Sequence, residues 1–213
     1  MRPISFTTTA LASASTAYIA SSQTPLAAGN LTLTPAAATL VSETTVPRYG
    51  LFISINCAGA DAGRTFTVTG TKPGGAAQTE VLNGSNTSQT LSTKYWETVT
   101  QIAVDAATAG AVTAGIRQTG ATDWMPLDIY TPNAQTAIQV DVTGTINYSV
   151  VYTIEDPFDT SITQIAIAHP VAALTTGSTD VSGQTTVIMR AVRLLINSGS
   201  GTAKMTIVQQ STM

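Results

Sequence analysis

Residues 190–210, RAVRLLINSGSGTAKMTIVQQ, form two apolar runs on either side of a Gly-Ser tip. Within each run apolar residues recur at every second position, which is the period of a β-strand. One face of the two runs then carries six apolar side chains: Val192, Leu194, Ile196, Ala203, Met205 and Ile207. The tip contains Gly199 and Gly201, and glycine readily adopts the positive φ angles that a tight loop needs. The stretch therefore predicts a β-hairpin.

The opposite face of this hairpin is mixed in character. It carries Arg193, Leu195, Lys204, Thr206 and Val208. A free β-edge with such a half-apolar face favours pairing with another strand. We therefore expect the hairpin to close a β domain and to offer an edge to a neighbouring molecule.

Similar short runs recur along the chain between closely spaced Gly and Pro residues. In RTFTVTGT (64–71), Phe66 and Val68 share one face and threonines occupy the other. In INYSVVYTIE (146–155), every second residue from Ile146 to Ile154 is apolar or aromatic, and no segment sustains a helical period. We expect strands near residues 4–9, 31–34, 50–56, 65–71, 79–82, 89–91, 99–104, 112–116, 137–142, 146–154, 162–168, 185–188, 190–197 and 203–209.

This pattern predicts an all-β protein with less than about 10% helix, built from two β-sandwich domains of jelly-roll or Ig-like type. The best boundary signal is IRQTGATDWMPLDIYTPNAQ (116–135), which holds Gly120, two prolines and two large aromatic residues and is expected to be a connection. We place an extended N-terminal arm at 1–30, a first sandwich at 31–118 and a second at 119–213. VTGT occurs at 68–71 and again at 142–145, a weak sign of internal duplication.

The composition is poor in charge. Only 10% of residues are Asp, Glu, Lys or Arg, against about 25% in a typical soluble domain. The chain holds 39 threonines, more than its 21 charged residues together. Threonine suits the half-exposed face of a strand. Because a free monomer usually needs more surface charge, we expect a symmetric homo-oligomer whose surface is partly covered by neighbours.

Nucleic acid and membrane are not expected partners. The nine Lys and Arg residues are scattered singly and the net charge is −3, so no basic patch for phosphates is formed. No apolar run approaches the 18 or so residues of a membrane span. The first 22 residues are too polar in their middle for a signal peptide, so we expect synthesis in a cytoplasm.

No residue stands out as catalytic, and we expect no enzyme. The single histidine, His169, lies in IAHPV without a G-x-S-x-G nucleophile motif, and we expect it to be hydrogen-bonded at a strand end. The single cysteine, Cys57, lies in an apolar run and is predicted to be buried and inert. One His and one Cys do not supply the ligands of a zinc site.

The acidic residues gather once, in IEDPFD, which contains Glu155, Asp156 and Asp159. Calcium binding is conceivable there, but the spacing is not that of an EF-hand, and a turn that follows the strand is the simpler interpretation. Acid pairs such as Asp123 with Asp128, or Glu155 with Asp159, have the residue types of a glycosidase, as do pairs in any chain with twelve acids. No cofactor or metal is expected.

Two further motifs have a functional and a structural interpretation. TKPGGAAQTE (71–80) lacks the Lys-Ser/Thr ending of a phosphate-binding loop and is expected to be a hairpin loop. The pairs Tyr95 with Trp96 and Trp124 with Tyr130 could stack on a sugar, but core packing is the favoured interpretation.

Several segments together resemble a family of small virion-associated structural proteins of tailed bacteriophages. They are MRPISF, RTFTVTGT, GGAAQTEVLNG, VTQIAVDAATAGAVTAGI, WMPLDIY, VDVTGTINYSVVYTIEDPFD and MRAVRLLINSGSGTAKMTIVQQ, and they span almost the entire chain. The resemblance implies a non-enzymatic particle component present in symmetry-related copies, and it carries no functional residue with it.

We therefore expect a structural protein of the virion, assembled in the host cytoplasm, which serves as head decoration or cement or as a short-tail or neck component. Its expected partners are other virion proteins of the capsid, portal, neck or tail. The alternative is a receptor- or carbohydrate-binding module of a tail fibre, which would display an exposed aromatic patch.

Overall fold

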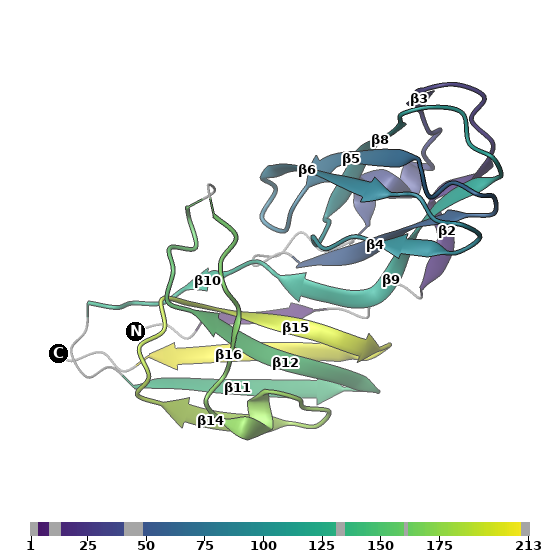
Figure 1. The fold of residues 1–213 in the computed structure, drawn as a ribbon. Coiled ribbons are helices and arrows are strands. Elements are labelled where there is room, and N and C mark those ends of the chain that lie inside the picture. The colour runs from purple at the N-terminus through teal and green to yellow at the C-terminus, as the bar shows by residue number, and fades with distance from the viewer. Residues whose placement is uncertain (1–3, 9–13, 41–48, 131–134, 160–161, 210–213) are drawn as a thin grey trace. The chain divides into compact units, whose positions relative to one another are not determined.

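The computed structural model describes residues 4–8, 14–40, 49–130, 135–159 and 162–209, and it is all-β as predicted (Figure 1). The described residues contain two short 3-10 helices, η1 (Pro35–Thr39) and η2 (Ala172–Leu174), and no α-helix. No helix in this part of the chain has the length and apolarity needed to cross a membrane. The strands are β1 (Ile4–Thr8), β2 (Ser15–Gln23), β3 (Gly29–Asn30), β4 (Tyr49–Cys57), β5 (Thr65–Thr71), β6 (Ala77–Asn83), β7 (Gln89–Leu91), β8 (Thr98–Val104), β9 (Val112–Thr122), β10 (Met125–Pro126), β11 (Thr136–Thr143), β12 (Ile146–Thr153), β13 (Ile167–Ala168), β14 (Val181–Thr185), β15 (Ala191–Gly199) and β16 (Thr202–Gln209).

The chain folds into two compact units that divide between Gly120 and Ala121. The N-terminal unit contains β2 to β8 and all but the last two residues of β9. The C-terminal unit contains β10 to β16 and also β1. The segment 116–135, which the sequence suggests is a connection, is in its first part a strand, because β9 continues to Thr122.

In the N-terminal unit, one sheet has the order β3-β8-β5-β6, and β9, β4 and β7 are neighbours in another. Threonine alternates with larger apolar residues in β5, so that Phe66 and Val68 are fully buried while the threonines are half-exposed, as predicted. Strand β4 contributes Leu51, Ile53 and Ile55 to the same core, and all three are fully buried.

In the C-terminal unit, one sheet has the order β1-β16-β11-β14, while β12 pairs with β13 and β15, and β15 also pairs with β10. The core is formed by the apolar sets that alternate along these strands. It contains Ile138, Val140, Tyr148, Val150, Val192, Leu194, Ile196, Ala203, Met205 and Ile207.

The predicted C-terminal hairpin is wrong, although its two strands and their buried faces are confirmed. Strand β15 pairs with β12, and β16 pairs with β11 and β1, so neither is the free edge that we expected. Residues 199–202 form a corner between two sheets. This corner lies against the equivalent corner between β11 and β12, where Ser200 N and Gly201 N both donate to Thr145 O at 3.0 and 2.8 Å.

The segment 1–30 is divided between the two units. Strand β1 pairs antiparallel with β16, with Ile4 opposite Ile207. Strand β2, which was not predicted, pairs with β9 and places Ile19 and Ala20 fully inside the N-terminal unit. The strand expected near residues 4–9 is therefore confirmed, while residues 15–23, expected to be part of the arm, form a strand of the N-terminal unit with Ile19 and Ala20 in its core.

Three other predicted strands are shifted or shortened. Residues 31–34 are no strand, and the strand in this region is β3, which ends at Asn30; the side-chain amide of Gln23 binds both Thr32 N and Thr32 O, at 2.9 and 3.0 Å. The strand expected near 185–188 lies at Val181–Thr185 and ends where Thr185 Oγ1 accepts a hydrogen bond from Val187 N. Of 162–168, only Ile167 and Ala168 pair, since Ile165 N is bound to the Glu155 side chain.

Candidate functional site

His169 follows strand β13, is 2% exposed, and has the structural role expected of it. Its backbone N donates to Val150 O, and its Nδ1 accepts a hydrogen bond from Val171 N at 3.1 Å. Burial lowers the pKa of His169 below its ordinary value. The hydrogen bonds of His169 tie the segment after β13 to Val150 of β12 and to Val171.

The acidic residues of IEDPFD hold a loop together. Asp156 forms an ion pair with Arg190 at 2.9 Å, and its other oxygen accepts a hydrogen bond from Phe158 N. Glu155 Oε2 accepts from Ile165 N at 2.6 Å. Among the described residues, no group of three or more His, Cys, Asp or Glu side chains is placed to hold a metal ion.

The pair Asp123 and Asp128 also serves the local backbone. Asp123 Oδ1 accepts a hydrogen bond from Trp124 N, and Asp128 Oδ1 accepts from Tyr130 N. Each carboxylate thus stabilises its own turn, as Asp residues often do.

The aromatic residues do not form a sugar-stacking platform. Trp96 is fully buried, which confirms the interpretation as core, and Tyr95 stacks on Phe52 with ring centroids 4.3 Å apart. The guanidinium of Arg193 lies over the Trp124 ring at 4.4 Å from its centroid. Of the four aromatic residues singled out, Tyr130 alone is largely exposed, at 89%.

Cys57 and the glycine-containing loop 72–76 are both parts of the β-sheet framework. Cys57 is buried in β4, as predicted. The loop 72–76 joins β5 to β6 as a hairpin, with Lys72 N donating to Ala76 O and with Gly74 and Gly75 at φ angles of 91° and 85°. The interpretation of TKPGGAAQTE as a hairpin loop is therefore confirmed.

Three buried carboxylates were not singled out from the sequence: Glu97, which is 7% exposed, and Asp61 and Glu80, which bind distant backbone groups. Asp61 is 1% exposed, and its Oδ1 accepts a hydrogen bond from Ala109 N at 2.6 Å, which ties the turn after β4 to the turn before β9. Glu80 is 9% exposed and accepts hydrogen bonds from the backbone N and the hydroxyl of Thr93. Nothing in the alternating pattern marks Asp61 or Glu80, because their partners lie 48 and 13 residues away.

The most unusual surfaces of the molecule are two uncharged sheet faces. The first, the N-terminal neutral face, lies across β8, β5 and β6, where cross-strand pairing places these side chains on one side of the sheet: Thr67, Thr69, Thr79, Val81, Gln101 and Ala103. All six are half-exposed or exposed, and none is ionisable. The opposite side of the same strands carries the buried core residues Phe66, Val68 and Ile102.

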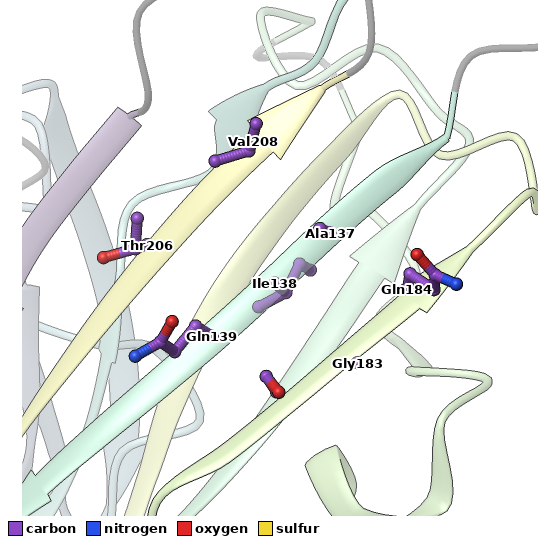
Figure 2. Close-up of a pocket in the computed structure, with 8 residues that line it drawn as sticks. Ala137, Ile138, Gln139, Gly183, Gln184, Thr206 and Val208 are labelled. Carbon is purple, nitrogen blue, oxygen red and sulfur yellow. The ribbon is translucent and has the colours of Figure 1, made fainter.

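The second, the C-terminal neutral face, lies across β16, β11 and β14. Its residues are Ala137, Gln139, Ser182, Gln184, Thr206 and Val208, paired as Ala137 with Val208 and Gln184, and Gln139 with Thr206 and Ser182. Figure 2 shows the side chains of Gln139, Gln184, Thr206 and Val208 on these three strands. They line a shallow hollow of about 320 Å³. The next cross-strand pair on this side of β11 and β16 is charged, because Asp141 lies opposite Lys204.

Four of the six residues of this second face lie in predicted strands, 137–142 and 203–209, and the other two were missed. The alternation in 203–209 already places Thr206 and Val208 on the outer side of the domain. Ser182 and Gln184 were missed because the Gly-containing stretch VSGQT does not resemble a strand, and only its pairing with β11 makes it one. No protein-family model matches this chain, and no curated protein matches it.

Proposed function

We propose that this chain is a non-enzymatic structural component of a bacteriophage particle, either head decoration or a short-tail or neck part, and that it acts through protein–protein contacts. We propose further that each unit is a β-sandwich of jelly-roll or Ig-like type. The observation that supports this function best is the pair of neutral faces, each of which presents six uncharged side chains on one side of a sheet. Such faces associate without repulsion between like charges.

The same faces suit a symmetric homo-oligomer, for preference a trimer or hexamer, docked on other virion proteins. Hydroxyl and amide side chains form hydrogen bonds across an interface, and a standard interface covers about 800 Å² per partner. The carbohydrate-binding alternative has in its favour the exposed rings of Phe158 and Tyr130, at 74% and 89%. The other large apolar side chains exposed among the described residues are aliphatic, which favours a protein partner.

Copy number in purified particles tests the proposal. Quantitative mass spectrometry of the phage that encodes this chain should find it in a fixed multiple, six or twelve for a tail or neck part and a larger icosahedral multiple for head decoration. Absence of the chain from purified particles would contradict the proposed function.

A further inference from the structure

Exposed apolar side chains are concentrated at one end of the C-terminal unit. Two loops, residues 154–165 and 186–190, carry six of them, with exposures between 40% and 77%. We call this group the apolar loop patch, and its members are Ile154, Phe158, Ile162, Ile165, Val187 and Ile188. In Figure 1 both loops lie at the end of the C-terminal unit where β12 ends and β15 begins.

The loops that carry the patch are joined to each other. Arg190 N donates a hydrogen bond to Thr153 O at 2.8 Å, and the Arg190 side chain reaches Asp156 across the two loops. A third loop joins them, because Leu127 N donates to Arg190 O, and this loop adds the exposed side chains of Ile129 and Tyr130.

Polar contacts fix the apolar residues in their outward positions. Phe158 N is bound to Asp156 Oδ1, Ile165 N to Glu155 Oε2 and Val187 N to Thr185 Oγ1, at 3.0, 2.6 and 3.1 Å. Gln164 Nε2 further donates to the backbone oxygens of Asp156 and Asp159. The carboxylates of Glu155 and Asp156 thus hold the backbone at two of the exposed apolar residues, Phe158 and Ile165.

The six members together expose an area close to that of one partner in a standard interface. At about 200 Å² for a fully exposed large side chain, its six members present on the order of 700 Å². The largest apolar patch on an ordinary monomer is about 300–600 Å², and a standard protein interface covers about 800 Å² per partner. In the described part of the N-terminal unit, by contrast, the exposed large apolar residues are Leu26, Val81 and Leu91, which lie on separate elements.

The charges around the patch indicate the chemistry of its partner. Glu155, Asp156 and Asp159 lie in the first loop, Asp128 lies in the third, and Arg190 is the one cation of the three loops. Two copies of this chain that met patch to patch would bring these carboxylates together, which is unfavourable. A protein surface with an apolar centre and Lys or Arg side chains around it fits the patch in both respects.

From this arrangement we infer that the apolar loop patch is the docking surface of the chain for a different virion protein, one whose contact region is apolar and bordered by basic side chains. The inference rests on the proposed function, and it places the contact with another virion protein at one end of the C-terminal unit. The two neutral faces are the surfaces that we propose for contacts between copies of the chain.

The test uses purified full-length chain and particles of the same phage assembled without it. The exposed positions allow a matched comparison, since Ile188 is 77% exposed in the patch and Leu26 is 89% exposed in the N-terminal unit. We expect Ile188→Lys to weaken binding to the particles about 10- to 100-fold, through loss of an apolar contact and repulsion from the basic border. Leu26→Lys makes the same chemical change elsewhere and should bind as the unchanged chain does.

A second variant isolates the role of charge. Glu155→Gln keeps an acceptor for Ile165 N but removes one negative charge, so it should weaken binding several-fold and make it less salt-dependent. Circular dichroism of each variant should match that of the unchanged chain. Equal binding of the Ile188→Lys and Leu26→Lys chains would overturn the inference and leave the proposed function standing. Failure of the unchanged chain to bind the particles at all would count against both.

Discussion

Individual polar residues in this molecule mostly serve the backbone. His169 binds Val171 N, Asp61 binds Ala109 N and Glu80 binds Thr93 N, and all three side chains are buried. Each satisfies a backbone donor that no strand partner reaches, and an unsatisfied buried donor costs about 1–3 kcal/mol. At this scale, the few ionisable residues of the chain maintain its irregular segments.

His169 should make the C-terminal unit less stable in mild acid. Its pKa is lowered in the folded chain, so between that pKa and the ordinary value the unfolded chain binds a proton that the folded chain does not. The free energy of unfolding should therefore fall as pH decreases below about 6.5, by at most about 1.4 kcal/mol per pH unit. Above that pH, His169 should contribute no change of stability with pH.

His169→Asn keeps an acceptor for Val171 N and cannot titrate. Urea unfolding of both chains at about pH 7.5 and about pH 5.5 should show a smaller loss of stability in the Asn chain. An identical loss in both chains would show that His169 does not contribute to the pH dependence.

At the scale of elements, the corners between sheets are the decisive feature of the C-terminal unit. Gly199 has a φ of 109°, and a Cβ added there would lie 2.4 Å from Thr145 O. Gly144, in the neighbouring corner, has a φ of 81°, and its added Cβ would lie 3.2 Å from the Cα of Gly201. The two corners pack closely at their glycines, so a side chain at Gly199 would meet the backbone of the other corner.

Gly199→Ala should destabilise the C-terminal unit by about 2–4 kcal/mol, from the strained φ and the clash with Thr145 O. Gly63→Ala is a suitable control, because an added Cβ there has nothing within 4 Å and its φ is not positive. The control should change stability by less than about 1 kcal/mol. Urea unfolding followed by tryptophan fluorescence measures both, since Trp96 and Trp124 lie in different units. Equal stabilities of the two variants would show that the corner tolerates a side chain.

For the whole molecule, the two kinds of surface predict two kinds of association. Contacts between copies through the neutral faces involve no ionisable side chains, whereas the apolar loop patch is bordered by carboxylates. VTGT, which occurs twice, gives no evidence of equivalent halves: Gly70 lies inside β5 at a shift of register, while Gly144 follows the end of β11 at a corner.

Association between copies should therefore depend only weakly on salt. Sedimentation of the purified chain at about 0.05 M and about 0.5 M ionic strength should give dissociation constants that differ by less than about threefold. A chain that stays monomeric at high concentration in both solutions would contradict the proposed homo-oligomer. A large loss of association at high salt would instead show that charged surfaces join the copies.

The alternation of apolar and polar residues along the chain, taken alone, determined much of this protein's local structure. It identified the all-β class, ten of the strands within a few residues, and the buried sides of β5, β15 and β16, because burial of every second side chain follows from the geometry of a single strand. The composition likewise led to the expectation of uncharged surfaces. Cys57 was recognised as core from its apolar surroundings, and core packing was the favoured interpretation of Trp96.

Tertiary structure decided which strands are neighbours. The same alternation is compatible with a hairpin and with a corner between two sheets, so the pattern in 190–210 could not tell that β15 pairs with β12 and β16 with β1 and β11. Strand β14 and the segment 31–34 were misjudged for the same reason, since pairing with β11 makes the first a strand, and in the second Thr32 binds the side chain of Gln23. The apolar loop patch, too, arises only when loops about 30 residues apart meet through Arg190. Hydrogen bonds between such distant segments depend on the folded arrangement, so they leave no periodic pattern in the sequence.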